Sequence, residues 1–167
     1  MVLAVPKVLP LNPPHSQSCG PVCIKMAADY FGLPYSLSYI DRLTRARERG
    51  GLTNDELLRA IRRLGLSVRT RKRASWQDLR RLNTERRLII LAWMLEGHRG
   101  HFSVLDRATA EHIFLADPEV SRVRRLPKHT FMRLWFDYDN IYYPRTLSQI
   151  SLRWMAVVSE PPRKQKC

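Results

Sequence analysis

The sequence predicts an α+β fold in which helices come first and an antiparallel sheet follows. In residues 19–66 the apolar positions recur at three- and four-residue spacing, which is the period of a helix. From residue 87 onward they alternate or run continuously over short stretches, as in strands. Segregated patterns of this kind predict helices packed on an antiparallel sheet. The chain has 167 residues, 44% of them hydrophobic, so we expect one domain over 1–167.

The helical half follows an extended arm over residues 1–14, where four prolines exclude a helix. Thr53 with Glu56, and Ser75 with Asp78, have the spacing of capping boxes and predict helix starts. The predicted helices are 19–31, 36–47, one within 51–65, and 76–82.

Strands are predicted over 66–72, 87–94, 101–106, 112–117, 123–127 and 150–159. The third and fourth of these form a hairpin joined by RATAE. If they pair symmetrically about Thr109, His101 lies directly opposite Asp117, and both side chains project from one face. A register shift by one residue would place the two side chains on opposite faces.

The charge distribution indicates which partners the surface attracts. The formal net charge is +14, from 29 Lys and Arg against 15 Asp and Glu. Residues 59–87 contain ten Arg and one Lys, opposed only by Asp78 and Glu85, and the tail over 160–167 is also basic. Such a surplus attracts nucleic acid, acidic lipid or an acidic partner. Two interpretations of the Arg-rich 59–87 region stay open, a polyanion contact and an ordinary solvated surface.

Composition also bears on compartment and cofactors. Three cysteines, an odd number, argue against a disulfide framework, so we expect a reducing compartment, the cytoplasm. No apolar run approaches the roughly 18–20 residues that span a bilayer, and prolines interrupt any signal-peptide core. A zinc site built on Cys19, Cys23 and a histidine would need more ligands than the spacing supplies, so we expect no metal and no cofactor. The oligomeric state is left open.

Cys19 stands where a loop turns into a helix. It is either a small buried hydrophobe or a nucleophile, because a helix N-terminus and a nearby imidazolium both favour a thiolate. Gly20 would let a substrate approach the backbone closely. A histidine held by a carboxylate, as in the His101–Asp117 pair, is half of a nucleophilic triad. Cys23 follows one helical turn later and is predicted to face the core.

Five segments of the chain form a recognisable set: SCGPVCIKMAADYFG (18–32), GLTNDELLRAIRRLGL (51–66), LAWM (91–94), GHFSVLDRATAEHIFLADPE (100–119) and LPKHTFMRLWFDYD (126–139). Together and in this order they resemble the bacteriocin-processing C39 and C39-like family of papain-like cysteine peptidases. The resemblance implies a papain-like fold and a peptidase in which Cys19 is the nucleophile, His101 the general base and Asp117 its orienting partner. The F-x-x-x-W-F-D pattern in the last segment resembles the standalone branch of the family.

The family also has a glutamine about six residues before the cysteine, whose amide helps to form the oxyanion hole. Pro13 occupies that position here, so Asn12 and Gln17 are the candidate donors. A misplaced donor would cost about 2.7–4 kcal/mol of transition-state stabilisation. The further candidates for the substrate cleft are Gly20, His15, Trp93 and His98.

Two other functions fit the same residues. A cysteine-dependent acyltransferase would use the same acyl-enzyme and differ only in the acceptor that the cleft admits. A catalytically degenerate member of the family would bind a peptide or a polyanion without cleaving it. A peptide or protein substrate is the partner that the peptidase interpretation implies.

Overall fold

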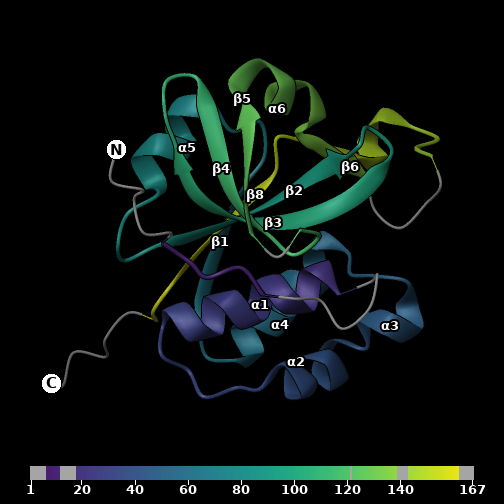
Figure 1. Cartoon of the computed structure of the whole chain (residues 1–167). Helices are drawn as coiled ribbons and strands as arrows, with labels where there is room; N and C mark the ends of the chain where they lie inside the picture. Colours follow the sequence, from purple (N-terminus) through teal and green to yellow (C-terminus); the bar gives the residue numbers. More distant parts are fainter. Residues whose placement is uncertain (1–6, 12–17, 121, 139–142, 162–167) are drawn as a thin grey trace, which may run out of the picture.

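The computed structural model describes residues 7–11, 18–120, 122–138 and 143–161. In this part of the chain an antiparallel six-stranded sheet has the order β1-β8-β2-β3-β4-β5 (Figure 1). Its strands are β1 (Ser67–Arg71), β8 (Met155–Ser159), β2 (Leu88–Leu95), β3 (Arg99–Ala108), β4 (His112–Asp117) and β5 (Arg122–Pro127). A separate antiparallel pair is formed by β6 (Phe136–Tyr138) and β7 (Ile150–Leu152), and a 3₁₀ turn, η1 (Leu147–Gln149), directly precedes β7.

Helices cover both faces of the sheet (Figure 1). On one side lie α1 (Cys19–Tyr30), α2 (Leu37–Thr44), α3 (Ala46–Arg49) and α4 (Asn54–Arg63), and on the other α5 (Trp76–Leu82) and α6 (Lys128–Leu134). Strand β2 is buried along its whole length, and its side chains alternate between the two layers. Ile90 packs in the core with α1 and α4, whereas Ile89 and Leu91 pack with α5 and α6. The predicted α+β fold is confirmed.

Local sequence signals place several helix ends correctly. The Thr53 hydroxyl accepts a hydrogen bond from the Glu56 backbone N–H, and the Glu56 carboxylate accepts one from the Thr53 N–H. Ser75 and Asp78 form the same reciprocal pair at the start of α5. Both capping boxes are confirmed because each depends on residues only three positions apart.

Two predicted features of the C-terminal part are wrong. No helix is predicted after residue 127, but α6 forms there and its Phe131 side chain is fully buried. The single strand predicted over 150–159 is two strands, because Arg153 has a positive φ of 48° and turns the chain between β7 and β8. As a result β7 pairs with β6, and β8 enters the main sheet between β1 and β2.

The hairpin register differs from the prediction by two residues at its open end. Val104 pairs with Ala116, and a β-bulge at Asp106 interrupts the pairing before Arg107 meets Phe114. The bulge presents the Asp106 carboxylate to the backbone N–H of Lys7, at 2.5 Å. Because the shift at the open end is an even number of residues, side chains that were predicted to share a face still do.

Among the described residues, no helix is both long enough and apolar enough to cross a bilayer.

Candidate active site

Cys19 is the first residue of α1 and is half-buried. Its thiol stands at the positive end of a 12-residue helix that packs against β3 and β2. One turn further along α1, Cys23 is fully buried in the core. Burial raises the pKa of the Cys23 thiol well above its ordinary value, and the nearby Cys19 and Asp117 raise it further. The helix therefore presents one accessible thiol and hides the other.

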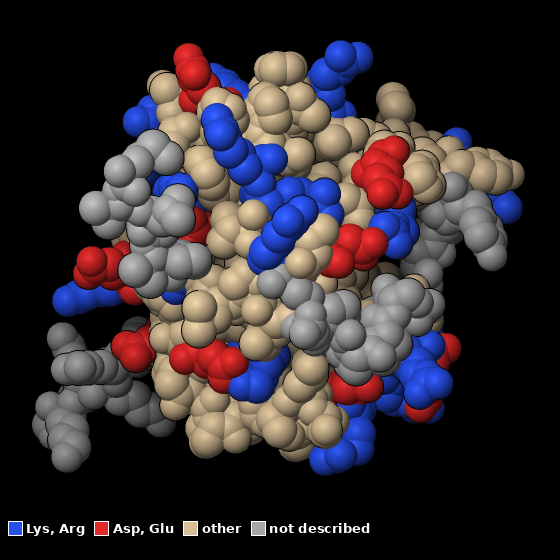
Figure 2. All heavy atoms as spheres, viewed as in Figure 1, with Lys and Arg blue, Asp and Glu red and all other residues tan. Residues whose placement is uncertain are grey.

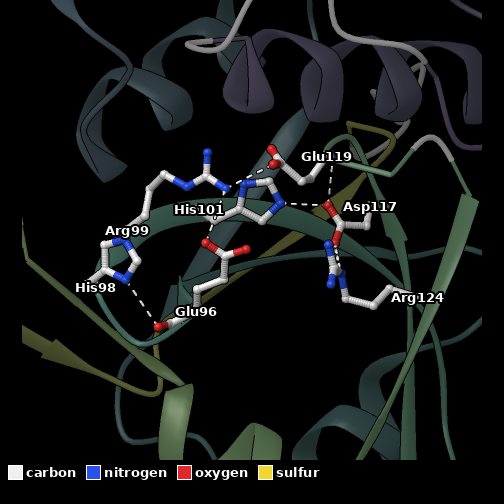
Figure 3. Close-up of polar contacts among 7 residues, drawn as sticks. All are labelled: Glu96, His98, Arg99, His101, Asp117, Glu119 and Arg124. Atoms are coloured by element: carbon white, nitrogen blue, oxygen red, sulfur yellow. Dashed lines mark hydrogen bonds and ion pairs between the residues drawn. The ribbon is translucent and has the colours of Figure 1, made fainter.

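His101 and Asp117 form a buried hydrogen-bonded pair. The His101 Nε2 atom lies 2.6 Å from Asp117 Oδ1, and the two residues are 6% and 0% exposed (Figure 3). If the β3–β4 register continues one residue beyond the Val104–Ala116 pair, Asp117 lies opposite Ser103. His101, two residues before Ser103, is then the diagonal neighbour of Asp117. Diagonal neighbours on one face are within reach of long side chains. The pair is therefore formed, although not by the direct opposition that symmetric pairing about Thr109 predicts.

Cys19 lies near enough to His101 to affect the pKa of the ring. Burial lowers the pKa of His101, but hydrogen bonds with Asp117 and Cys19, and the charges of both partners, outweigh burial and raise it from 6.5 to about 9. Since Asp117 engages Nε2, Nδ1 is the ring nitrogen left for Cys19. The arrangement favours an imidazolium at neutral pH, placed between a sulfur and a carboxylate.

An aromatic wall supports the imidazole from the layer that contains α6. Trp93 pairs directly with His101 across β2 and β3, and their rings meet edge-on with centroids 5.6 Å apart. The Trp93 indole N–H donates to Ser103 Oγ at 3.1 Å, and its ring packs on Phe131. At 1% exposure Trp93 does not line an open cleft, which corrects that expectation. It instead packs edge-on against the buried histidine ring.

Asp117 has further partners from two directions. Its Oδ1 accepts the backbone N–H of Glu119 at 2.9 Å, and its Oδ2 accepts Arg124 Nε (Figure 3). Burial raises the pKa of Asp117, but these donors together with His101 outweigh it and hold the carboxyl below its usual range. Arg99 donates to the Glu119 carboxylate at 2.9 Å, which links the start of β3 to the turn after β4 beside the pair.

The other predicted site residues divide into three groups. Asn12, His15 and Gln17 lie outside the described residues. His98 is exposed at the β2–β3 turn, with Nδ1 3.1 Å from the Glu96 carbonyl oxygen (Figure 3). Gly20 is buried, and Leu52 fills the space beside its Cα, so its missing side chain serves helix packing rather than an open approach for substrate.

Sequence reasoning missed Arg124 and the Glu119 backbone N–H. Arg124 stands on β5 across from Leu115, diagonal to Asp117. The available signal was an arginine-rich strand a few residues after the Asp-Pro at 117–118, and it becomes informative only once the β4–β5 register is known.

A large hollow in the surface lies away from this site. One hollow of about 840 Å³ is lined by Tyr30, Phe31 and residues of the 85–87 and 159–161 segments, at the far end of α1 from Cys19. In the described parts of the chain no three His, Cys, Asp or Glu side chains are grouped so as to hold a metal ion.

The family follows from the sequence. The model of the Peptidase C39 family matches residues 13–141, so the chain belongs to the Peptidase C39 family. The match includes Cys19, His101 and Asp117. A search of curated proteins found no match.

Solved structures with the same fold include peptidase domains of transporters. The peptidase domain of Streptococcus ComA, described as a bi-functional ABC transporter involved in quorum sensing, superposes with a TM-score of 0.68 at 20% identity, covering 92% of this chain and 99% of that domain. A double-glycine-motif protease from an AMS/PCAT transporter, solved with a leader peptide, gives 0.69 at 17% identity and 92% of each chain. The Streptococcus mutans ComA peptidase domain gives 0.58 at 17% identity, covering 92% and 98%. The fold is thus that of C39, papain-like cysteine peptidase domains.

Proposed function

We propose that the chain is a cysteine peptidase whose catalytic triad is Cys19, His101 and Asp117. The single observation that carries the proposal is the position of His101, whose Nε2 lies 2.6 Å from Asp117 Oδ1 and whose pKa the nearby Cys19 raises together with Asp117. An imidazole between a thiol and a carboxylate is the arrangement that nucleophilic cleavage of an amide requires.

The proposed reaction has two stages. Cys19 Sγ bonds to the carbonyl carbon of the substrate, the C–N bond breaks, and the His101 imidazolium gives its proton to the leaving amine. Water then attacks the thioester while His101 takes up a proton, the S–C bond breaks, and a carboxylic acid leaves. Asp117 stays ionised and keeps the ring in one tautomer. The Cys19 backbone N–H, with the amide of Asn12 or Gln17, is proposed to hold the oxyanion.

A peptide is the proposed substrate. The double-glycine-motif protease with a similar fold was solved in complex with a leader peptide. Hydrolysis and acyl transfer share the acyl-enzyme, so the released product separates them: a free carboxylic acid indicates a peptidase, and an acylated amine or alcohol indicates a transferase.

The first test is alkylation by iodoacetamide at pH 7, with peptide mapping of the label. Cys19 is expected to be alkylated much faster than buried Cys23. H101A is expected to slow the alkylation of Cys19 at least tenfold, because the ring proposed to stabilise the thiolate is gone. H98A is the matched control, since it removes a neighbouring exposed histidine and should leave the rate unchanged. Equal, slow labelling of Cys19 and Cys23, or no effect of H101A, would contradict the triad.

We further infer that the Arg-rich 59–87 region contacts polyanions. All eleven of its Lys and Arg side chains are exposed. Within the described residues only Arg71 and Arg81 have ion-pair partners, and both pair with Asp78. The C-terminal half of α4 adds Arg59, Arg62 and Arg63 to a hollow of about 390 Å³. This contact is separate from the triad.

A further inference from the structure

We propose that Arg124 is a positioning residue that fixes the Asp117 carboxylate so that Oδ1 is aimed at the His101 ring. The inference rests on the proposed function, because it assigns a role within the proposed triad. Arg124 acts through Asp117 and not on a substrate, so its effect should be visible at the histidine before any substrate is present.

Different donors bind the two oxygens of the Asp117 carboxylate. Oδ1 accepts from His101 Nε2 and from the Glu119 backbone N–H, while Oδ2 accepts from Arg124 Nε. A carboxylate held only at Oδ1 could still turn about its χ2 torsion, which is broad for aspartate. A donor on the second oxygen fixes the plane of the group, and the Nε–H of the planar Arg124 guanidinium is such a directional donor.

The positive charge beside the Asp117 carboxylate changes during the proposed reaction. Asp117 is fully buried, and a buried carboxylate without a cation is costly. When the His101 imidazolium gives up its proton, it no longer supplies the neighbouring positive charge. Arg124 remains paired with Asp117 throughout, with its side chain 24% exposed and Asp117 at 0%. Asp117 can therefore stay ionised while His101 passes between its charged and neutral forms.

Asp117 pairs with only one of two nearby arginines on β5. Arg122 lies directly opposite Asp117 in the β4–β5 register, yet it is exposed, and the ion pair goes instead to Arg124, on the diagonal. Figure 3 shows the Arg124 side chain turned toward the Asp117 carboxylate, on the side away from Glu119. Two arginines on one edge strand thus differ in their contact with the triad, which supplies a matched control.

The experiment compares the wild type with R124M, R124K and R122M and needs no substrate. Two quantities are measured at pH 7: the rate constant for alkylation of Cys19 by iodoacetamide, and the low-field proton resonance of the His101 ring N–H that is bonded to Asp117. The resonance is assigned by its loss in H101A. Thermal melting followed by circular dichroism shows whether each variant is folded.

R124M is expected to broaden or remove the resonance and to slow alkylation of Cys19 about tenfold or more, since small misplacements within a catalytic group have large effects. R124K keeps the charge without the planar donor, so it should retain the resonance in weakened form and lose two- to fivefold in rate. R122M should match the wild type. If R124M does not fold, the R124K result decides whether Arg124 positions Asp117.

Three outcomes overturn the proposal. A folded R124M with wild-type resonance and rate would show that Arg124 does not position Asp117. If R124M cannot be folded, wild-type behaviour of R124K would show the same. Equal losses in R122M and R124M would indicate a general effect of net charge. By contrast, failure of the triad itself is recognised in the wild type, where Cys19 would react no faster than Cys23.

Discussion

His101 determines the protonation chemistry of the site, because its environment pulls its pKa in two directions. Burial lowers the pKa, while Asp117 and Cys19 raise it, with a net result of about 9. Replacing Asp117 by alanine removes a hydrogen bond and a charge that raise the pKa and leaves the burial that lowers it. D117A should therefore lower the pKa of His101 by roughly one unit or more. A fall of one pKa unit means that the preference for the charged ring decreases by about 1.36 kcal/mol.

The measurement is an NMR titration of the His101 ring carbon proton in wild type and D117A. A fall in the pKa also moves the alkaline limit of imidazolium-dependent activity to lower pH in D117A. E119A is the control, since Glu119 contacts Asp117 through its backbone N–H, which the substitution keeps. An unchanged His101 pKa in D117A would show that the 2.6 Å contact does not control the ring.

Individual site residues differed in how far the sequence could predict them. Cys19 and its place at the start of α1 follow from a local pattern, and that placement is confirmed. The partnership of His101 with Asp117 was predicted from a register that proved wrong by two residues, and it forms because an even shift preserves the face. Arg124 could not be predicted, because its contact depends on a third strand.

At the scale of elements, α1 and the segment before α4 are fitted closely at Gly20. A Cβ added there would lie 2.7 Å from Leu52 Cδ1 and 3.3 Å from Leu52 Cβ. Alanine gains up to about 1 kcal/mol in helix propensity, but overpacking costs about 1–3 kcal/mol. We expect G20A to reduce the free energy of unfolding by about 1–2 kcal/mol in urea denaturation, and to slow alkylation of the adjacent Cys19.

The double variant G20A/L52A tests the stated cause. Removing the Leu52 side chain makes room for the new methyl group, so the two substitutions should be less destabilising together than the sum of their separate effects. Strict additivity would mean that the contact with Leu52 is not responsible for the cost.

Elements were predictable where their signals are local. The capping boxes at Thr53 and Ser75 depend on neighbours three residues away. The bulge at Asp106 is bound by the backbone of Lys7, 99 residues distant, and no local pattern encodes that contact. Helix α6 has one fully buried residue, Phe131, which packs on Trp93 and Trp135, so tertiary contacts rather than periodicity support it.

At the scale of the whole molecule, basic side chains are spread widely. Figure 2 shows Lys and Arg over several parts of the face in view, with acidic side chains interspersed. Within the described residues, the 59–87 region concentrates eleven exposed cations, of which only Arg71 and Arg81 have ion-pair partners. We expect weak binding to single-stranded DNA of mixed sequence, in the micromolar range at 50 mM NaCl and falling steeply toward 200 mM.

The triple variant R59Q/R62Q/R63Q should weaken this binding and reduce its salt dependence, because α4 would lose three cations on one surface. R122Q/R125Q on β5 is the control for net charge. Fluorescence anisotropy over a series of NaCl concentrations gives both quantities. Binding that is absent, or insensitive to salt, would leave the basic surface as an ordinary solvated one.

The position of β8 has a consequence for biosynthesis. This strand is made after every other strand of the sheet, yet it lies between β1 and β2. Until it emerges from the ribosome, the Leu88–Leu91 half of the apolar strand β2 lacks the strand that pairs with it on that edge. An exposed apolar edge is a site for association with other chains. A nascent chain that stalls before β8 would therefore display its most apolar strand to the translation machinery and to chaperones.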